Sequence, residues 1–329
     1  MRVAVIGNCH ADIVAQVVRM ALRSSQSLDC RHIVSYESTT AVDQQFIAEA
    51  DRTLIQVTDF KNSRPGAQDQ AINYRNPGYF PLVAVNFLYP GAGKPHPRAS
   101  ESRTPYCPSG YFEGQVSDQL LIRLMTEYPH DSSASLVQRY LDADYAKIVD
   151  LDRIFEMNRI KSQRIGAAAS MDLWPKIEAM FRYVPLFWTY LHPAGSLLRD
   201  ICRHALRQLD VSLSEVEIEA AVDTVKEPLG FAHMPIHPSI VRHFGIEWAT
   251  PRYRYRMMPE GRFTVSEFAL RYVTFEHNDD LNRLIFNIHN NIELNPYLAV
   301  PRINRIISAS YTLKKIRVAL QTYPKGIRR

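Results

Sequence analysis

The hydrophobic period of the chain changes at Gly7, and this change constrains the fold more than any other feature. Residues 1–6 form a short, largely apolar run with β-branched Val3, Val5 and Ile6, bounded by Gly7, which is typical of a buried strand. From Ala11 onward the apolar residues recur every three or four positions, which predicts an amphipathic helix. The chain therefore begins with a strand, a tight turn at residues 7–10 and a helix.

This turn places reactive side chains at a helix N-terminus, where backbone N–H groups favour anions. We therefore expect Cys9 to have a lowered thiol pKa and to act as a nucleophile or to lie beside a thioester. The alternative is a small residue packed in the turn. His10 is a candidate general base or an exposed first-turn residue. Asn8 is a candidate helix N-cap, and Gly7 permits the turn.

The composition narrows the class of protein. The chain has 329 residues, about two domains on the usual prior, and 46% hydrophobic residues, as in ordinary globular proteins. Its net charge of +5 fits an anionic ligand and does not demand nucleic acid. The four cysteines are scattered, which argues against a disulfide framework and a zinc site. We expect neither a secretory signal nor a membrane span, and we expect a cytoplasmic protein without a bound metal.

Strands alternating with helices predict an α/β fold with a doubly wound, mostly parallel sheet. The further elements expected in this sheet are strands at 30–36, 53–57 and 81–87 and a helix at 40–50. Ligands of such sheets bind outside the carboxyl ends of the strands. We therefore expect Cys9, His10, Gln56 and Asn86 at one edge of the sheet.

The rest of the chain, from residue 89 onward, also contains recognisable patterns. The expected features are a Pro- and Gly-rich ligand wall at 89–114, a helical insertion at 117–183, a last strand at 184–191, a helix capped by Ser196, a capping box of Ser212 and Glu215, a strand-like stretch at 252–256, a helix at 265–275 and a basic stretch at 302–329. The basic stretch fits peripheral contact with a membrane, an acidic sugar or simply solvent. We expect an α/β domain at 1–210 and a mixed, mainly helical region at 211–329.

Two further residues are candidates for chemistry. Gln56 stands in an apolar strand, where a buried amide needs partners, so it is either an oxyanion-hole donor or a core glutamine satisfied by the backbone. His192 ends the last expected strand and either faces the same cleft as a base or is a structural histidine. Thr189 occupies the place three residues earlier where one large hydrolase class keeps an aspartate, so no acidic partner is assigned.

Several stretches, in this order and spacing, resemble the WcbI family of capsular polysaccharide biosynthesis acetyltransferases. They are Val5–Ala11, Ala50–Gln56, Val83–Pro97, Leu186–Pro193 with its following helix, and Met234–Pro238. The resemblance implies a flavodoxin-like fold related to the SGNH hydrolases, binding of coenzyme A, and transfer of an acetyl group to a capsular sugar. It also implies that the Gly7–Cys9 stretch stands where those hydrolases have Gly-Asp-Ser, and that His192 is their late histidine. Gln56 lies about where they keep an oxyanion donor.

The expected function is therefore an acetyl-CoA-dependent O-acetyltransferase acting on a capsular or surface polysaccharide or its precursor. The catalytic candidates are Cys9, His10, Gln56 and His192, and the candidates for holding coenzyme A are Gly7, Asn8, Lys61, Arg64, Lys94 and Arg98. Cys9 would form an acyl-enzyme or line the thioester site. The alternatives are an esterase or deacetylase acting on glycans, and a non-catalytic protein that binds coenzyme A or a glycan.

Overall fold

The computed structural model describes residues 1–23, 28–35, 40–58, 74–97, 116–257 and 261–275. Its contacts divide the chain into two compact units. The first consists of Met1–Phe87 and Asp150–Gly230, and the second of Leu88–Val149 and the described residues from Phe231 onward. The domains expected at 1–210 and 211–329 stay a prediction.

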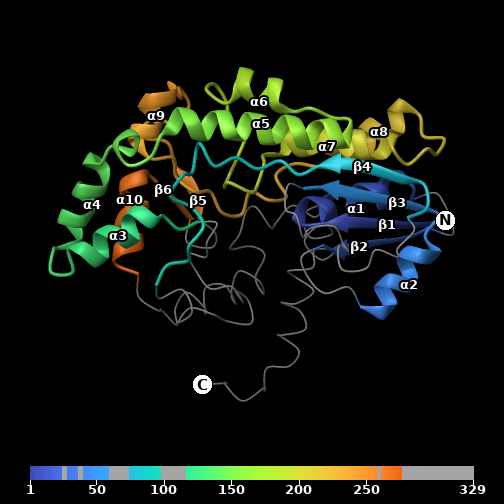
Figure 1. Cartoon of the computed structure of the whole chain (residues 1–329), viewed down its shortest axis with the longest axis horizontal. Helices are drawn as coiled ribbons and strands as arrows, with labels where there is room; N and C mark the ends of the chain where they lie inside the picture. Colours follow the sequence, from blue (N-terminus) through green and yellow to red (C-terminus); the bar gives the residue numbers. More distant parts are fainter. Residues whose placement is uncertain (24–27, 36–39, 59–73, 98–115, 258–260, 276–329) are drawn as a thin grey trace, which may run out of the picture. The chain divides into compact units, whose positions relative to one another are not determined.

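A four-stranded parallel sheet forms the centre of the first unit (Figure 1). Its strands are β1 (Arg2–Gly7), β2 (Asp29–Val34), β3 (Arg52–Val57) and β4 (Pro77–Pro81). They lie in the order β2-β1-β3-β4, so β1 has a neighbour on each side. From its second residue to its last β1 is buried, as expected of a central parallel strand. The predicted α/β class is confirmed.

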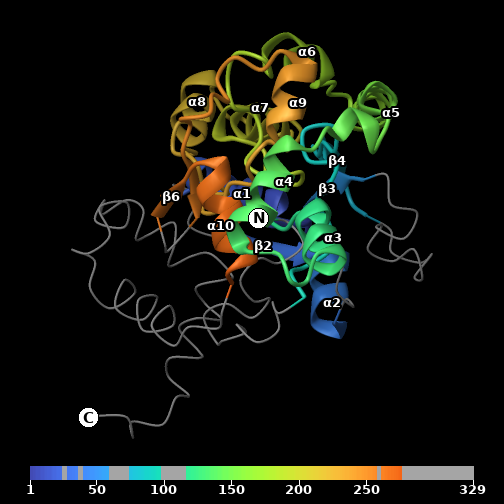
Figure 2. The same ribbon diagram turned by 90° about the vertical axis from the view of Figure 1, so that its left-hand side faces the viewer.

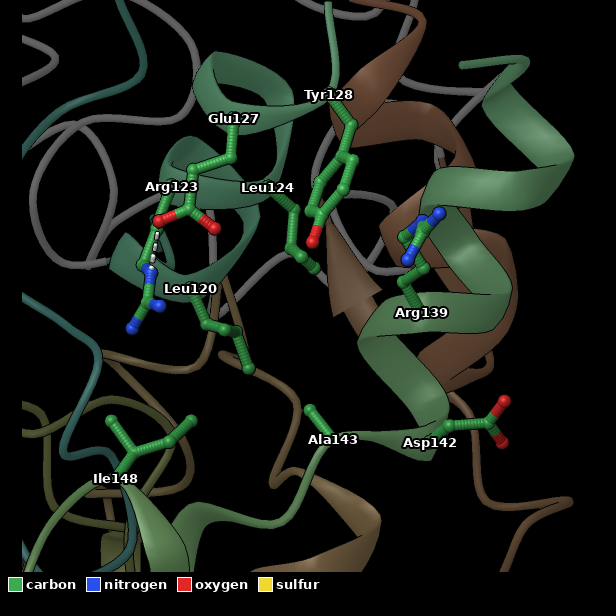
Figure 3. Close-up of a pocket in the computed structure, with 9 residues that line it drawn as sticks. All are labelled: Leu120, Arg123, Leu124, Glu127, Tyr128, Arg139, Asp142, Ala143 and Ile148. Atoms are coloured by element: carbon green, nitrogen blue, oxygen red, sulfur yellow. Dashed lines mark hydrogen bonds and ion pairs between the residues drawn. The ribbon is translucent and has the colours of Figure 1, made fainter.

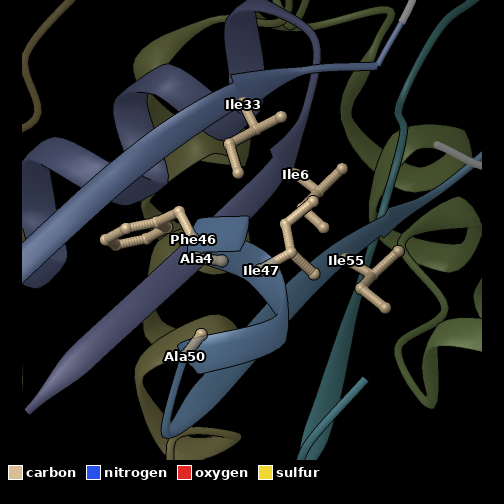
Figure 4. Packing of buried hydrophobic residues seen from close by; sticks show 7 residues of the cluster. All are labelled: Ala4, Ile6, Ile33, Phe46, Ile47, Ala50 and Ile55. Carbon is tan, nitrogen blue, oxygen red and sulfur yellow. The ribbon is translucent and has the colours of Figure 1, made fainter. Parts of the chain in front are cut away.

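Two helices cover opposite faces of this sheet. They are α1 (Cys9–Ala21) and α2 (Ala41–Glu49). Alternate side chains of β2 separate the faces, because Cys30 and His32 contact α1 whereas Ile33 belongs to the cluster under α2. That cluster contains Ala4, Ile6, Ile33, Phe46, Ile47, Ala50 and Ile55 (Figure 4). The side chains of Cys30 and His32 therefore lie on the same face of the sheet as α1.

Four more helices belong to the first unit and can be followed in Figures 1 and 2. They are α5 (Leu151–Ala169), α6 (Trp174–Met180), α7 (Gly195–Arg207) and α8 (Glu215–Val222). Helices α7 and α8 pack against α1, and α5 packs against β3 and β4. Helix α1 is therefore held between the sheet and two later helices, which buries the start of the chain.

The second unit is mainly helical. Its elements are α3 (Gln119–Glu127), α4 (Ser133–Asp142), the 3-10 turn η2 (Tyr145–Lys147), α9 (Pro238–Phe244), β5 (Tyr255–Met257), β6 (Gly261–Phe263) and α10 (Val265–Val273). Helix α10 contacts α3 and α4 (Figures 1 and 2). Buried Asp118 accepts hydrogen bonds from the hydroxyls of Tyr140 and Tyr145. Within the described residues, no helix is long and apolar enough to cross a membrane.

Two of the expected strands were wrong. The strand expected at 81–87 begins earlier, as β4, and the backbone then leaves the sheet so that the Val85 N–H donates to Tyr190 O at 2.9 Å. The segment 184–191 is a loop that is buried at residues 186–189 and has one isolated bridge, between Phe187 and Pro193. Thr189 Oγ1 accepts hydrogen bonds from the backbone N–H groups of Leu191 and His192, so the chain turns back at this point. The apolar run therefore reflects burial without a strand.

Two expected helix caps were also wrong. Helix α7 begins at Gly195, and Glu227 Oε2 accepts the Gly195 N–H at 2.9 Å, so Ser196 is no cap. The capping box of α8 is made by Ser214 and Glu217, two residues later than expected. The helix expected at 40–50 is confirmed as α2, and the one expected at 265–275 as α10.

Candidate functional site

The Gly7–His10 turn is tied to the neighbouring strand β3. A Cβ atom on Gly7 would lie 2.6 Å from Gln56 Oε1 and 2.8 Å from Ala11 Cβ, so only glycine fits there. The Asn8 N–H donates to Gln56 Oε1 at 2.8 Å. The structure therefore brings Gln56 and the turn together, although they are far apart in sequence.

Asn8 is the N-cap of α1. Its Oδ1 accepts the His10 N–H at 3.0 Å, as the sequence predicts for a residue at this position. The His10 amide is therefore already bonded within the cap. It is therefore not a free donor for a ligand oxygen, whereas Gln56 Nε2 has no hydrogen-bond partner among the described residues.

The predicted lowering of the Cys9 pKa was wrong. Cys9 is half-buried, and desolvation raises the pKa of its thiol to about 12. The backbone N–H groups of His10 and Cys9 lower this pKa, but their effect is smaller than that of desolvation, and the Asp12 carboxylate raises it further. The thiol is therefore protonated at neutral pH.

His10 is a buried, oriented imidazole and not an exposed first-turn residue. Its Nε2 lies 2.8 Å from Leu191 O, and because a carbonyl only accepts, Nε2 carries the proton and Nδ1 the lone pair. Nδ1 is buried and has no hydrogen-bond partner among the described residues. Burial lowers the pKa of His10 to about 4, against a smaller opposing effect of the Leu191 carbonyl. The ring is therefore neutral at pH 7.

His192 is brought to the same place. It is buried, and desolvation followed by the field of His10 lowers its pKa to about 3, so the two imidazoles are neighbours. Thr189 Oγ1 accepts the His192 N–H at 3.2 Å and thereby holds the loop. Of the four catalytic candidates, Cys9, His10 and Gln56 meet at the turn, and His192 lies next to His10.

Sequence reasoning missed two residues on the other side of the turn. His32 Nε2 lies 3.1 Å from Gly7 O, and His32 Nδ1 lies 3.7 Å from Asp12 Oδ1. Asp12 could have been found, because it stands three residues after Cys9 on the same helix. His32 could not, because only the pairing of β2 with β1 places it beneath the turn.

Comparisons with known proteins agree with this fold. No family model matches the chain, and no curated protein matches it. A solved structure of WcbI matches with a TM-score of 0.56 at 14% sequence identity, over 97% of this chain and 98% of that chain. The fold is WcbI-like. That WcbI is described as a novel polysaccharide biosynthesis enzyme, in a form without a disulfide bond between coenzyme A and one of its cysteines.

The WcbI-like fold leaves the expected phosphate contacts untested. Lys61, Arg64 and Arg98 lie outside the described residues, and Lys94 is an exposed residue of the second unit. Across the described ranges, no group of three or more His, Cys, Asp or Glu side chains is arranged to hold a metal ion. The proposed contacts of these four basic residues with phosphate groups therefore stay predictions.

The second unit of this WcbI-like fold carries a shallow open groove of about 410 Å³ (Figure 3). It is lined by Leu120, Arg123, Leu124, Glu127, Tyr128, Arg139, Asp142, Ala143 and Ile148. Arg123 is paired with Glu127, and Arg139 with Asp131, while the Arg139 guanidinium also stacks on the Tyr128 ring. Because both arginines have carboxylate partners, we assign no anionic ligand to this groove.

The two buried histidines predict acid sensitivity. Their pKa values are lowered on folding, so as pH falls from 6.5 to 4 the unfolded chain binds protons that the folded chain does not, and stability decreases. For His10 alone, a fall from 6.5 to about 4 corresponds to roughly 3 kcal/mol. Urea unfolding at pH 7 and pH 4 should show a loss that is smaller by about this amount in His10→Gln. An equal loss in both proteins would contradict the buried neutral ring.

Proposed function

We propose that the protein is an acetyl-CoA-dependent O-acetyltransferase that modifies a capsular or surface polysaccharide or its precursor. The observation that carries the proposal is a pair of buried polar atoms at the Gly7–His10 turn, Gln56 Nε2 and His10 Nδ1, that have no hydrogen-bond partner in the described part of the chain. The WcbI-like fold supports it, because that WcbI is described as a polysaccharide biosynthesis enzyme together with coenzyme A.

These two atoms suit the two reacting groups of an acetyl transfer. A buried polar group without a partner costs about 1–3 kcal/mol, so a pair of them at one turn indicates a place for ligand atoms. Gln56 Nε2 can only donate, which fits a thioester carbonyl, and His10 Nδ1 can accept, which fits a sugar hydroxyl. The residues at the turn therefore fit the acetyl end of the coenzyme.

Acetyl-CoA, when bound, supplies the activated acetyl group. His10 Nδ1 would take the proton of the acceptor hydroxyl as its oxygen bonds to the acetyl carbon, and would return this proton to the coenzyme thiolate as the carbon–sulfur bond breaks. The Leu191 carbonyl keeps the ring in the required tautomer and orientation. Gln56 Nε2 donates to the carbonyl oxygen as negative charge develops on it. His192 packs beside His10 and helps to exclude water. Gly7 and Asn8 line the acetyl end, and Lys61, Arg64, Lys94 and Arg98 are proposed to bind the phosphates. The expected setting is the cytoplasm.

A thermal shift screen followed by a transfer assay tests the proposal. Coenzyme A and acetyl-CoA should raise the melting temperature, with about 2.7 kcal/mol of stabilisation at a hundredfold excess over Kd. NAD, and nucleotides that carry no additional attached sugar, should not raise it. Acetyl-CoA consumption should then depend on an added glycan acceptor. Rapid hydrolysis of a chromogenic acetyl ester without coenzyme A would favour an esterase instead. Binding without turnover on any acceptor would favour a non-catalytic protein.

Cys9 is expected to be dispensable for the chemical step. Because burial keeps its thiol protonated, we expect direct transfer, and Cys9→Ala should retain turnover within about tenfold of the native value. Loss of a covalent nucleophile typically costs many orders of magnitude, about 10⁶ in a serine protease. A fall of that size in Cys9→Ala, with the melting temperature unchanged, would establish an acyl-enzyme route. Cys9→Ser is the matched variant that preserves a small polar side chain.

A further inference from the structure

The imidazole of His32 lies between two hydrogen-bond acceptors beneath the Gly7–His10 turn. Its Nε2 is 3.1 Å from Gly7 O, and its Nδ1 is 3.7 Å from Asp12 Oδ1. A neutral imidazole has a single N–H and can donate to only one of these oxygens. With one more proton, on the ring or on the carboxylate, both contacts become favourable. The arrangement therefore favours holding one proton between Asp12 and His32.

Asp12 connects this pair to the thiol. It stands three residues after Cys9 on α1, so the two side chains lie on neighbouring positions of the same helix face. Gln16 Nε2 donates to Asp12 Oδ2 at 2.9 Å and holds the carboxylate in place. The negative charge of Asp12 raises the pKa of the Cys9 thiol. A change in the charge on Asp12 therefore acts on Cys9.

The other groups that face the pair come from α1 and from the turn. Burial raises the pKa of Asp12 and lowers that of His32, while each partner's charge opposes the effect of burial on the other. The field of Arg19, whose guanidinium donates to Cys30 O, lowers the pKa of both. The Gly7 and Asn8 backbone favours the protonated ring. The ring of His32 therefore has the charged and polar groups needed to take up and release a proton.

We propose that Asp12 and His32 share one proton and that this pair controls how readily the Cys9 thiol ionises. While the proton is held, the pair has no net charge. When the proton leaves, the carboxylate charge is uncompensated and keeps the neighbouring thiol protonated. Both are positioning residues that act through Cys9 and the Gly7 carbonyl. The inference rests on the proposed function only in placing Cys9 at the site.

Alkylation of Cys9 by iodoacetamide tests the pair, since only the thiolate reacts. The rate is followed by mass spectrometry on the peptide that carries Cys9, in Asp12→Asn, His32→Gln and the double variant. Asp12→Asn removes the opposing charge and should raise the rate at pH 8 by about tenfold, which is one pKa unit. His32→Gln leaves the carboxylate uncompensated at every pH and should lower the rate several-fold at pH 6, where the native pair still holds its proton. In the Asp12→Asn background, His32→Gln should have no further effect.

The two single variants should change the alkylation rate in opposite directions, whereas structural damage at the turn would change both rates in the same direction. Glu178→Gln removes one negative charge from an exposed position of α6 and should leave the rate unchanged. Equal signs for the two single variants, no change in either, or a His32→Gln effect that persists without the carboxylate would overturn the proposal.

The native chain provides a second measurement in case the variants do not fold. The slope of log rate against pH should fall below one between pH 5 and pH 8, because the thiol becomes harder to ionise as the pair loses its proton. A constant slope of one over that interval would overturn the proposal. The assay contains neither coenzyme nor sugar. A failure here therefore leaves the proposed acetyl transfer untouched, and a failure to find transfer leaves this result untouched.

Discussion

Replacing Gly195 by alanine is expected to lower the free energy of unfolding by about 3 kcal/mol, the largest loss among the single substitutions considered. A Cβ atom at this position would lie 1.6 Å from the backbone oxygen of Lys226, so one of the two segments must move. Movement of Lys226 displaces Glu227, whose Oε2 accepts from the Gly195 N–H at 2.9 Å and from Trp188 Nε1 at 2.7 Å. The substitution therefore disrupts packing and two hydrogen bonds to a carboxylate.

Urea unfolding measures this loss, and Ser196→Ala is the matched control. Ser196 is the next residue in the same helical turn and is half-buried, so its replacement should change stability by less than about 0.5 kcal/mol. Helix propensity alone would make Gly195→Ala stabilising by up to about 1 kcal/mol, so the sign of the effect is informative. A loss below about 1 kcal/mol would mean that the segment at Lys226 relaxes without cost.

The start of the chain could be predicted because its signals are local. The apolar run of β1, the N-cap Asn8 and the helical period of α1 lie within a few residues of one another, and the structure has all three. The same holds for α2, which begins after its cap Thr40. These are the elements whose formation depends mainly on neighbours in sequence.

The loop before α7 could not be predicted, because its conformation depends on distant segments. Residues 184–191 are apolar enough for a strand, yet they fold back at Thr189 and are held by Glu227 through Trp188. A buried loop and a central strand can have the same apolar composition, so the sequence does not distinguish them. Here the difference lies in hydrogen bonds to distant segments. The loop matters for the site, since it carries both Leu191 O and His192.

The chemistry of the candidate site was also only partly predictable. Sequence placed Cys9, His10 and Gln56 at one edge of the sheet, and the structure brings them together. The sign of the Cys9 pKa shift was missed because the helix N-terminus was visible in the sequence, whereas burial depends on how later helices pack. The partner of His10 lies 181 residues away, so no local pattern could have assigned the tautomer.

That tautomer underlies the prediction with the largest effect on activity. His10→Gln is expected to lower acetyl-transfer turnover by about 10²–10⁴-fold, the usual contribution of a positioned general base. The glutamine amide keeps an N–H donor to face Leu191 O, so the loop should stay in place, whereas the lone pair at Nδ1 is lost. The affinity for coenzyme A should stay within about threefold, because the proposed role of His10 is to bind the proton of the acceptor.

One control and one further variant test whether His10 or His192 is the base. His130→Gln changes an exposed histidine of the second unit and should leave turnover unchanged. His192→Gln removes the adjacent imidazole, and if His10 is the base, its effect should be smaller than that of His10→Gln. The reverse order would assign the base to His192. If His10→Gln retained more than a tenth of native turnover, the buried Nδ1 would not receive the proton of the sugar hydroxyl, and the proposed geometry of transfer would be wrong.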